Sequence, residues 1–414
     1  MTDATFAPET VWEFTTAGTI RFGEGAAEEL PAVLRERTAD SALFVTDPGV
    51  VGAGILDPLT TSLADQVEVT VFDEVEPDPP LGAFEAAVET ARDVDPDVII
   101  GVGGGSSLDV AKVTGIVAAH GGDILDYVAP PTGQGRSVPG PGIPTIAIPT
   151  TAGTGSETTP VAVLSLPDRD LKVGISSRHQ YPDVALVDPL LTVSLPPGPT
   201  AASGMDALAH GIESYVTRRF DAKPRANPPE DRPDYGGRTV LTDQLGRKAI
   251  DLVGNHLRRA VNNGQDLEAR RAVSLGSLLA GMAFSNAGVG AAHAIGMAAG
   301  AEYHTPHGAT VAAVLPAVMR FNATGAFERS TAIARILGED VSGLGQEAAA
   351  RKGAEAVEKL RRDVGTPDGL EALGVPADAI PALAEKTMEL QRLLVSNPRR
   401  ASREDIEAIC RDAL

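Results

Sequence analysis

The sequence has a single cysteine, no long apolar run and a deficit of basic residues, and each shortage excludes a class of protein. Cys410 is the only cysteine among 414 residues. One chain can therefore form no internal disulfide, no cysteine-based zinc site and no iron–sulfur cluster. Any metal in this protein must be held by histidine and carboxylate side chains.

The apolar runs are interrupted by Gly, Pro or a charged residue well before the roughly 20 residues that a membrane helix needs. The first ten residues, MTDATFAPET, lack the basic-then-apolar order of a signal peptide. We therefore expect a cytoplasmic protein that does not enter a membrane.

Basic residues are outnumbered, 35 against 56 acidic ones, and the net charge is -21. Such a surface repels nucleic acid and anionic lipid, so neither is expected as a partner. The acidic residues are spread along the whole chain. Because concentrated salt suppresses repulsion among them, we also expect a halophilic protein.

The pattern of apolar residues divides the chain into two predicted domains, 1–195 and 196–414. The first alternates β-branched apolar runs with helical stretches such as Gly82–Val94 and Ser107–Ala119, which is typical of an α/β fold with a parallel sheet. Its clearest strand candidates are Ser41–Thr46, Val67–Phe72, Asp97–Val102 and Thr145–Ile148. After Leu195 helical periodicity dominates, which predicts an all-helical second domain. Within it, the Pro-rich segment Arg218–Arg238 is expected to be an exposed loop.

Two loops of small residues indicate a nucleotide site. Gly103, Gly104 and Gly105 follow a strand and lead through Ser106 into a helix, where backbone N–H groups and the helix N-terminus can hold a phosphate. A tight strand-to-helix turn needs glycine as well, and the spacing is not that of the usual dinucleotide fingerprint. The second loop, 149–157, offers threonine hydroxyls after a strand, although an ordinary Ser/Thr turn looks the same.

Asp47 ends the strand Ser41–Thr46, where a carboxylate can accept a hydrogen bond from a ribose hydroxyl. The same charge would repel a 2′-phosphate, so we expect NAD rather than NADP. The alternative for Asp47 is an N-cap or turn residue.

The metal candidates come from the second domain. Asp206 and His210 are four residues apart on a predicted buried helix, so they face the same side. Such a pair alone arises by chance in many chains. His293 and His307 lie among small and apolar residues, as in a closed, dry site. His304 lies beside a predicted turn and next to this site. It is a candidate for a catalytic proton carrier, and the alternative carriers are ribose hydroxyls and water.

Together these segments resemble the iron-containing (group III) alcohol dehydrogenase family, in the family's order and over nearly the whole chain. The segments are TIRFG from Thr19, GGGSSLDVAK from Gly103, TTAGTGSE from Thr150, DVALVDPL from Asp183, GMDALAHGIESY from Gly204 and the stretch 293–307.

The resemblance implies a Rossmann-like domain followed by a helical domain, the architecture of dehydroquinate synthase, with the active site in the cleft between them. By position it makes Asp206, His210, His293 and His307 the metal ligands. The positions that it implies for the cofactor are Asp47, Gly103, Gly104, Gly105, Ser106, Asp109, Thr150, Thr151, Thr154 and Lys172. It also implies a homo-oligomer, most simply a dimer.

The chain departs from the family pattern at Met297, where many members have a histidine near the nicotinamide, and at Asp78, where many have asparagine. The hydroxyacid–oxoacid transhydrogenase branch also lacks that histidine. That branch has a loop resembling RPDYGGR, followed by an aspartate, here Asp243.

The expected function is a metal-dependent hydride transfer between NAD(P) and a small alcohol, aldehyde or hydroxyacid. One carboxylate and three imidazoles suit Fe(II) or Zn(II). The alternatives are a hydroxyacid–oxoacid transhydrogenase, a related phosphate-substrate dehydrogenase or lyase, and a catalytically inactive module that binds metal and nucleotide.

Overall fold

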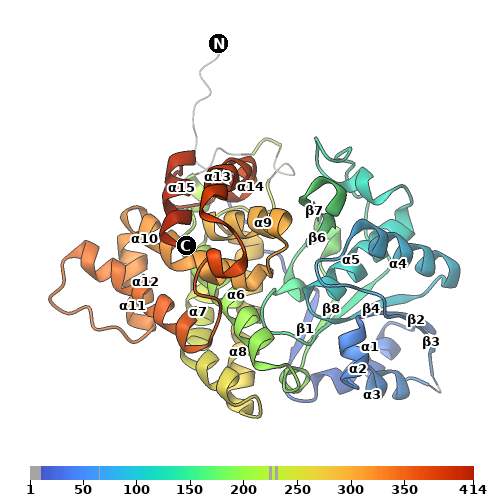
Figure 1. Ribbon diagram of the computed structural model, residues 1–414. Coiled ribbons are helices and arrows are strands. Elements are labelled where there is room, and N and C mark those ends of the chain that lie inside the picture. The colour runs from blue at the N-terminus through green and yellow to red at the C-terminus, as the bar shows by residue number, and fades with distance from the viewer. Residues whose placement is uncertain (1–10, 65, 223–225, 229–231) are drawn as a thin grey trace. The chain divides into compact units, whose positions relative to one another are not determined.

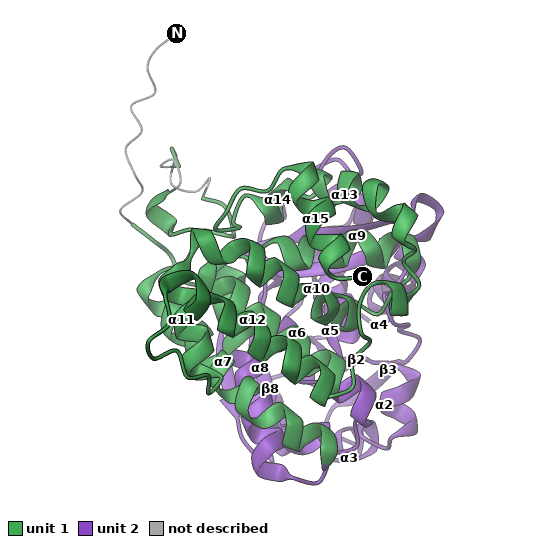
Figure 2. Ribbon diagram, turned by 60° about the vertical axis from the view of Figure 1, so that its left-hand side comes forward, with its two compact units in different colours: residues 1–15, 201–262, 279–414 green, residues 16–200, 263–278 purple. Residues whose placement is uncertain are grey.

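The protein, seen here as a computed structural model, is described over residues 11–64, 66–222, 226–228 and 232–414. It divides into two compact units (Figure 2). One unit contains residues 16–200 and 263–278, and the other contains 201–262, 279–414 and the N-terminal residues up to 15. Each unit is therefore assembled from separate stretches of the chain. The simple division at residue 195 stays a prediction.

A parallel six-stranded sheet with the order β1-β8-β5-β4-β2-β3 forms the centre of the first unit (Figure 1). The strands are β1 (Thr19–Phe22), β2 (Ser41–Val45), β3 (Glu68–Phe72), β4 (Val98–Gly103), β5 (Thr145–Pro149) and β8 (Val184–Val187). The predicted parallel sheet is confirmed, and the four predicted strands are β2 to β5. Each predicted boundary lies within one residue of the observed one.

Alternating side chains on the buried strands supply a core on each face of the sheet. Leu43 and Ile99 pack on one face with α4 (Leu81–Val94) and α5 (Gly105–His120). Phe44 and Ile100 pack on the other face with α1 (Leu30–Glu36), α2 (Pro48–Gly52) and α3 (Leu56–Thr61) (Figure 1). Strands buried on both faces explain why the sequence shows nearly continuous apolar runs there.

A β-hairpin that was not predicted completes this unit. Strands β6 (Val161–Leu166) and β7 (Leu171–Ser176) pair antiparallel. Their alternating buried residues, including Leu164 and Ile175, join the core on the α5 face. The turn residues between them, Pro167–Arg169, are the local signal that could have identified the hairpin.

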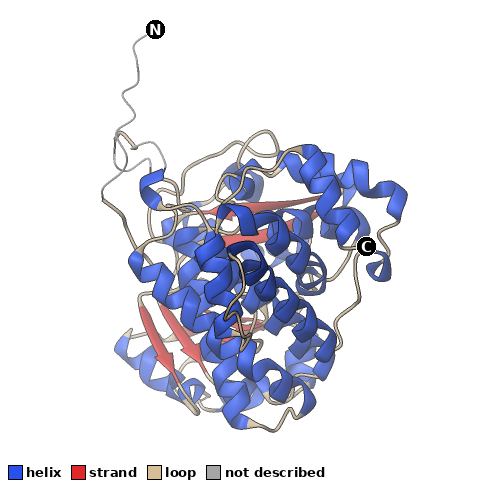
Figure 3. Cartoon of the chain, turned by 90° about the vertical axis from the view of Figure 1, so that its left-hand side faces the viewer, coloured by secondary structure: helices blue, strands red, loops and turns tan. Residues whose placement is uncertain are grey.

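Helices make up the second unit, as predicted. The strands of the described residues, red in Figure 3, all belong to the first unit. The helices of the second half of the chain are α6 (Pro197–Val216), α7 (Val240–Asn262), α8 (Leu267–Ala287), α9 (Ala291–Tyr303), α10 (His307–Asn322), α11 (Phe327–Ile336), α12 (Gln346–Asp363), α13 (Ile380–Glu389), α14 (Gln391–Leu394) and α15 (Arg403–Asp412). Helices α6 and α8 each contribute their first residues to the other unit.

The segment 218–238 is not simply an exposed loop, as its composition predicted. Tyr235 is buried, and Arg219 and Arg238 form an isolated bridge between the two ends of the segment. Residues 223–225 and 229–231 of the segment lie outside the described residues. In the part of the chain that is described, no single helix is long and apolar enough to cross a membrane; α8 and α9 reach that composition only as a sharply bent pair.

Candidate metal centre and nucleotide-binding loops

Three of the four predicted metal ligands form a buried cluster. Asp206 and His210 lie on consecutive turns of α6, and His293 lies in the first turn of α9. One potential ligand atom from each lies within 4.8 Å of those of the other two. The His210 ring stacks on Phe284 and on His293, with centroid distances of 4.1 and 4.3 Å, so its orientation is fixed by packing.

His307, the fourth predicted ligand, lies at the open side of this cluster. It is the first residue of α10, its side chain is 33% exposed, and its Nε2 is 3.7 Å from Asp206 Oδ1. Its ring centroid is 5.6 Å from that of His293. His307 therefore faces the same carboxylate oxygen as His293, although it is not part of the compact group of three.

Two atoms at the centre of the cluster are buried without a hydrogen-bond partner, Asp206 Oδ1 and His293 Nε2. They are 3.5 Å apart. Buried polar atoms without partners are rare in native structures because each costs roughly 1–3 kcal/mol. A carboxylate oxygen and an imidazole nitrogen are both metal-coordinating atoms. A divalent cation bound between them would give each of these unpartnered atoms a partner.

The electrostatics of the cluster favour a cation. Burial would raise the pKa of Asp206, but the surrounding imidazoles His210, His293 and His307 hold it well below its usual range. Burial lowers the pKa of His210 to about 3. Burial also opposes protonation of His293, but the negative charge of Asp206 and the hydrogen-bonded carboxylate of Glu213 raise its pKa to about 9. The buried carboxylates of Asp206 and Glu213 thus favour positive charge between them at His293. A cation bound to His293 would supply that charge.

Glu213 belongs to this site although sequence analysis did not identify it. Its Oε2 accepts a hydrogen bond from His293 Nδ1 at 2.6 Å, and its Oε1 accepts one from the Ala292 N–H at 2.9 Å. Because the ionised carboxylate can only accept, Nδ1 carries a proton whether the ring is charged or neutral. A metal that displaces the second proton would therefore find the Nε2 lone pair directed toward it. The available signal was its position on α6, three residues after His210, since a buried glutamate needs a partner.

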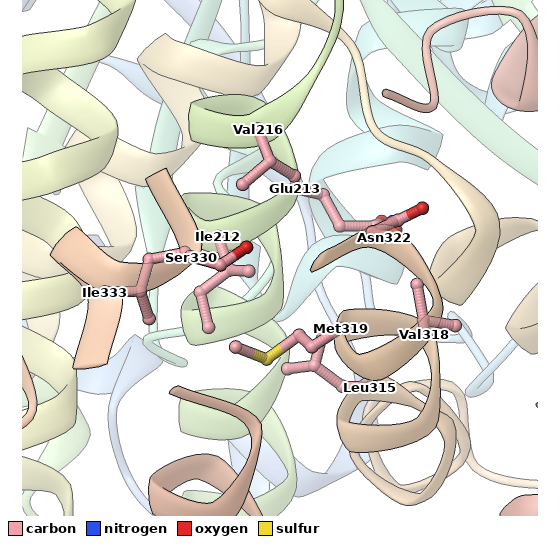
Figure 4. Close-up of a pocket in the computed structure, with 9 residues that line it drawn as sticks. All are labelled: Ile212, Glu213, Val216, Leu315, Val318, Met319, Asn322, Ser330 and Ile333. Carbon is pink, nitrogen blue, oxygen red and sulfur yellow. The ribbon is translucent and has the colours of Figure 1, made fainter. Parts of the chain in front are cut away.

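Mostly apolar side chains shield the Glu213 carboxylate. Figure 4 shows Glu213 on α6 beside Asn322 of α10, at the edge of a small cavity of about 10 Å³. The remaining lining residues are Ile212, Val216, Leu315, Val318, Met319, Ser330 and Ile333. The cavity can hold at most about one water molecule, so the Glu213–His293 hydrogen bond is protected from competition by solvent.

Glycines allow the helices of this site to approach closely. A Cβ atom on Gly308 would lie 2.5 Å from the carbonyl oxygen of Ala202 on α6 and 3.4 Å from Asp206 Cβ. A Cβ atom on Gly296 of α9 would lie 2.7 Å from Val311 Cγ2 on α10. The absence of side chains at these two positions therefore brings α6, α9 and α10 together around the ligands.

In the other unit, the two predicted nucleotide-binding loops contact each other. Gly103 has a φ of 152°, and the Thr150 N–H donates to its carbonyl oxygen at 2.9 Å. A Cβ atom on Gly105 would lie 2.7 Å from Thr154 Cγ2, and one on Gly104 would lie 3.5 Å from Thr151 Cγ2. Helix α5 begins at Gly105 with no side-chain cap. Its first N–H groups and the threonine hydroxyls thus lie at one place, as a phosphate site requires.

Asp109, predicted to bind the cofactor, has partners within the protein for both of its carboxylate oxygens. Its Oδ1 accepts a hydrogen bond from Ser156 Oγ at 2.6 Å, and its Oδ2 accepts one from the Val163 N–H at 2.8 Å. Its Oδ1 also lies 3.0 Å from the ammonium of Lys112, which is buried. Lys112 in turn donates to Ser156 Oγ and to the carbonyl oxygen of Val161. Asp109 and Lys112 therefore hold the second loop and the start of β6 in place.

The other predicted cofactor residues have structural partners as well. Asp47 caps α2 by accepting from the Val50 N–H at 3.0 Å, and its Oδ2 accepts from Ser107 Oγ, also at 3.0 Å. Asp47 is thus an N-cap residue, as the alternative interpretation of the sequence predicted. In this position its carboxylate lies beside the first turn of α5. Lys172 pairs with Asp78 at 2.7 Å.

His304 and Met297 lie on α9 or at its end. Met297 is inside the helix, and His304 ends it in the left-handed conformation with a φ of 51°. Among the described residues, the exposed His304 side chain makes no hydrogen bond or ion pair. Only two residues, Thr305 and Pro306, separate it in sequence from His307.

Comparison with known proteins agrees with this architecture. Residues 17–189 match the family model described as iron-containing alcohol dehydrogenase, and residues 237–414 match the C-terminal model of the Fe-containing alcohol dehydrogenase family.

Similar proteins span nearly the same length. The NAD-dependent methanol dehydrogenase of Bacillus methanolicus is 38% identical over 95% of this chain and 97% of its own. The mitochondrial hydroxyacid–oxoacid transhydrogenase of Xenopus tropicalis is 35% identical over 94% of this chain and 88% of its own. The crystal structure of a 1,3-propanediol oxidoreductase superposes with a TM-score of 0.88 at 35% identity, covering 98% of this chain and 100% of that one.

Proposed function

Because the chain belongs to the iron-containing alcohol dehydrogenase family, we propose that it transfers a hydride between NAD and a small alcohol or hydroxyacid at a site with one divalent metal. The observation that carries this proposal is the buried pair of unpartnered atoms, Asp206 Oδ1 and His293 Nε2, beside His210 and His307.

We assign the metal to Asp206, His210, His293 and His307. One carboxylate and three imidazoles fit Fe(II) or Zn(II) and suit Mg(II) or Ca(II) poorly. A bound ion of this kind would supply Lewis acidity to the oxygen of the alcohol or carbonyl substrate. The protein fixes the donor atoms: Phe284 holds the His210 ring, and Glu213 keeps the proton of His293 on Nδ1. The exposed side of His307 is the direction from which a substrate can reach the site.

We assign the cofactor to the loops around Gly103 and Thr150. The N–H groups at the start of α5 would hold the pyrophosphate, with Ser106, Thr151 and Thr154 nearby. Asp47 lies beside this site and would accept from a ribose hydroxyl, which favours NAD over NADP. Methanol dehydrogenase, the relative that is 38% identical, is described as NAD-dependent. Asp109 acts by positioning the second loop, and Lys172 contributes through its pair with Asp78.

The proton of the alcohol needs a carrier, and we assign it to His304, since Met297 replaces the histidine of many relatives. His304→Ala should lower turnover while leaving metal content unchanged. His256→Ala is the matched control, because the His256 ring bonds only to its own helix, at the carbonyl oxygen of Leu252. Unchanged kinetics of His304→Ala would remove this role.

The test of the function combines elemental analysis with a screen of alcohols and 2-hydroxyacids that follows NADH absorbance. The protein should contain one Fe or Zn per chain and reduce NAD with at least one substrate class. His210→Ala should lose the metal and the activity while still binding NAD. Bound metal and NAD with no turnover across the panel would indicate an inactive binding module instead.

Hydroxyacid–oxoacid transhydrogenase is the second candidate, and the observation that favours it is Met297 together with the loop before Asp243. The transhydrogenase of Xenopus tropicalis is 35% identical over 94% of this chain. In a transhydrogenase the hydride of one hydroxyacid passes to a second oxoacid while the nucleotide stays bound. Conversion of a hydroxyacid–oxoacid pair without added NAD would support it, and strict dependence on added NAD would exclude it.

We further propose that the protein acts in the cytoplasm, as a homodimer, at high salt. The support for the last point is the net charge of -21 spread along the chain. Molar KCl should raise the midpoint of thermal unfolding by screening repulsion. A midpoint independent of salt would exclude halophilic adaptation.

A further inference from the structure

A cavity of about 520 Å³ in the helical unit is lined by four arginines, although the chain as a whole is strongly acidic. The charged residues that line it are Arg218, Arg219, Arg238, Arg329, Asp221 and Glu328. Its volume falls in the range of about 300–1,000 Å³ that is usual for small-molecule sites. The local excess of positive charge is therefore opposite in sign to the charge of the protein.

Backbone contacts hold three of these guanidinium groups in position. Arg218 Nε donates to the carbonyl oxygen of Asn397 at 3.0 Å, Arg238 Nε to that of Thr217 at 2.8 Å, and Arg329 Nη1 to that of Tyr215 at 2.7 Å. Each of these bonds uses one N–H group and leaves others on the same side chain. The arginines are thus preorganised, which reduces the entropic cost of binding an anion.

Among the described residues, carboxylates neutralise only part of this group of arginines. Asp243 is taken by Arg329 through two hydrogen bonds of 2.8 and 2.6 Å and reaches Arg238 only at 3.4 Å. Asp221 pairs with Arg219 at 2.7 Å. Burial and the neighbouring positive charge of Arg329 lower the pKa of Arg238, although Asp243 and Asp221 act in the opposite direction.

Two helix N-termini add to the positive electrostatic potential of the arginines. Helices α11 and α12 both begin at the cavity, at Phe327 and Gln346, and neither has a side-chain cap. Their first-turn N–H groups carry partial positive charge. Arginines from the end of α6, the approach to α7 and the first turn of α11 thus surround the cavity together with two helix N-termini.

We propose that this cavity binds a small organic anion that carries several phosphate or carboxylate groups, at a site distinct from the metal centre. Helix α6 connects the two: it carries His210 and, six residues or about 9 Å further along, Val216, which lines the arginine cavity. Guanidinium groups recognise phosphate and carboxylate through paired hydrogen bonds, which sets the class of ligand.

The test is isothermal titration of the full-length protein with inorganic pyrophosphate and with tricarballylate, against sodium chloride at the same ionic strength. We expect saturable binding of one anion per chain. Saturation with only one of the two probes would assign the site to phosphates or to carboxylates. Saturation with neither would overturn the proposal.

Two variants locate the binding in this cavity. Arg219→Gln removes a half-exposed guanidinium, and Gln346→Glu adds a carboxylate in the first turn of α12, where acidic residues stabilise a helix. Each should weaken anion binding about tenfold, which corresponds to about 1.4 kcal/mol, while circular dichroism stays unchanged. Arg411→Gln is the control, because Arg411 on α15 is equally exposed and also pairs with one carboxylate, that of Glu407. Equal affinity in all three variants would place the anion elsewhere and refute the proposal.

Discussion

The Glu213 carboxylate accepts the Nδ1 proton of His293 at 2.6 Å, and through this bond the helix that carries Asp206 and His210 also orients the third ligand. Glu213→Gln should lower metal affinity by about 10–100-fold, because one of the two accepting oxygens becomes an NH2 group that cannot accept from His293 or from the Ala292 N–H. Metal content after dialysis against a competing chelator measures the effect. Glu347→Gln on the surface of α12 is the control. Full metal retention in Glu213→Gln would show that the bond does not position the ligand.

Gly308→Ala should damage the metal centre without changing any ligand. The added methyl group would lie 2.5 Å from the backbone oxygen of Ala202, so α10 must move away from α6 and carry His307 with it. We expect a loss of about 1–3 kcal/mol in the free energy of unfolding and a weaker metal site. Chemical denaturation and metal titration report the two effects. Gly345→Ala, where a Cβ atom meets nothing within 4 Å, should be neutral in both.

Asp109→Asn should destabilise the nucleotide-binding unit. The substitution leaves the buried ammonium of Lys112 without its paired carboxylate, and loss of one partner of a buried pair costs about 3–5 kcal/mol. Urea denaturation would measure this loss, and NAD affinity should fall with it because the Ser156 loop loses its anchor. Asp93→Asn, at an exposed position of α4, is the control. An unchanged unfolding midpoint in Asp109→Asn would contradict the structural role of the pair.

Glu157 predicts a pH dependence of stability. Burial raises the pKa of this carboxyl to about 7 from its usual 4.5. The folded protein therefore keeps a proton that the unfolded chain has lost, and the contribution of Glu157 to stability falls as the pH rises from about 4.5 to 7. Glu157→Gln removes this loss, so its free energy of unfolding relative to the parent should rise by about 3 kcal/mol over that interval and stay level above pH 7.

The comparison between variant and parent cancels the titration of the other acidic residues. Unfolding free energies at a series of pH values between 4.5 and 8 give the difference directly. Glu89→Gln, at an exposed position of α4, should show a constant difference. A constant difference for Glu157→Gln as well would mean that Glu157 is ionised throughout in the folded protein.

The sequence was sufficient to predict the parallel sheet, the helical second half and the grouping of the histidines with Asp206. The sheet, the helices and the pair Asp206 and His210 needed only local information, since apolar periodicity defines a strand or a helix and spacing places the pair on one helix face. The grouping of His293 and His307 with that pair came from the family resemblance. The partnership of Glu213 with His293 spans 80 residues, and no local pattern indicates it. Asp109 shows the opposite case, because its position after the glycine loop suggested a ligand contact while Ser156, Val163 and Lys112 occupy its oxygens.

At Gly308 the backbone of α10 meets the backbone of α6 with no side chain between them. The spacing of the proposed metal ligands is therefore set by main-chain contact, which a change of rotamer or a modest repacking of neighbours cannot adjust. During evolution, replacement of Asp206 or of a histidine could change which metal the site prefers. Substitutions around the site could not widen it gradually, because the backbones of α6 and α10 are in contact. The glycine thus restricts the evolutionary routes by which the centre can change.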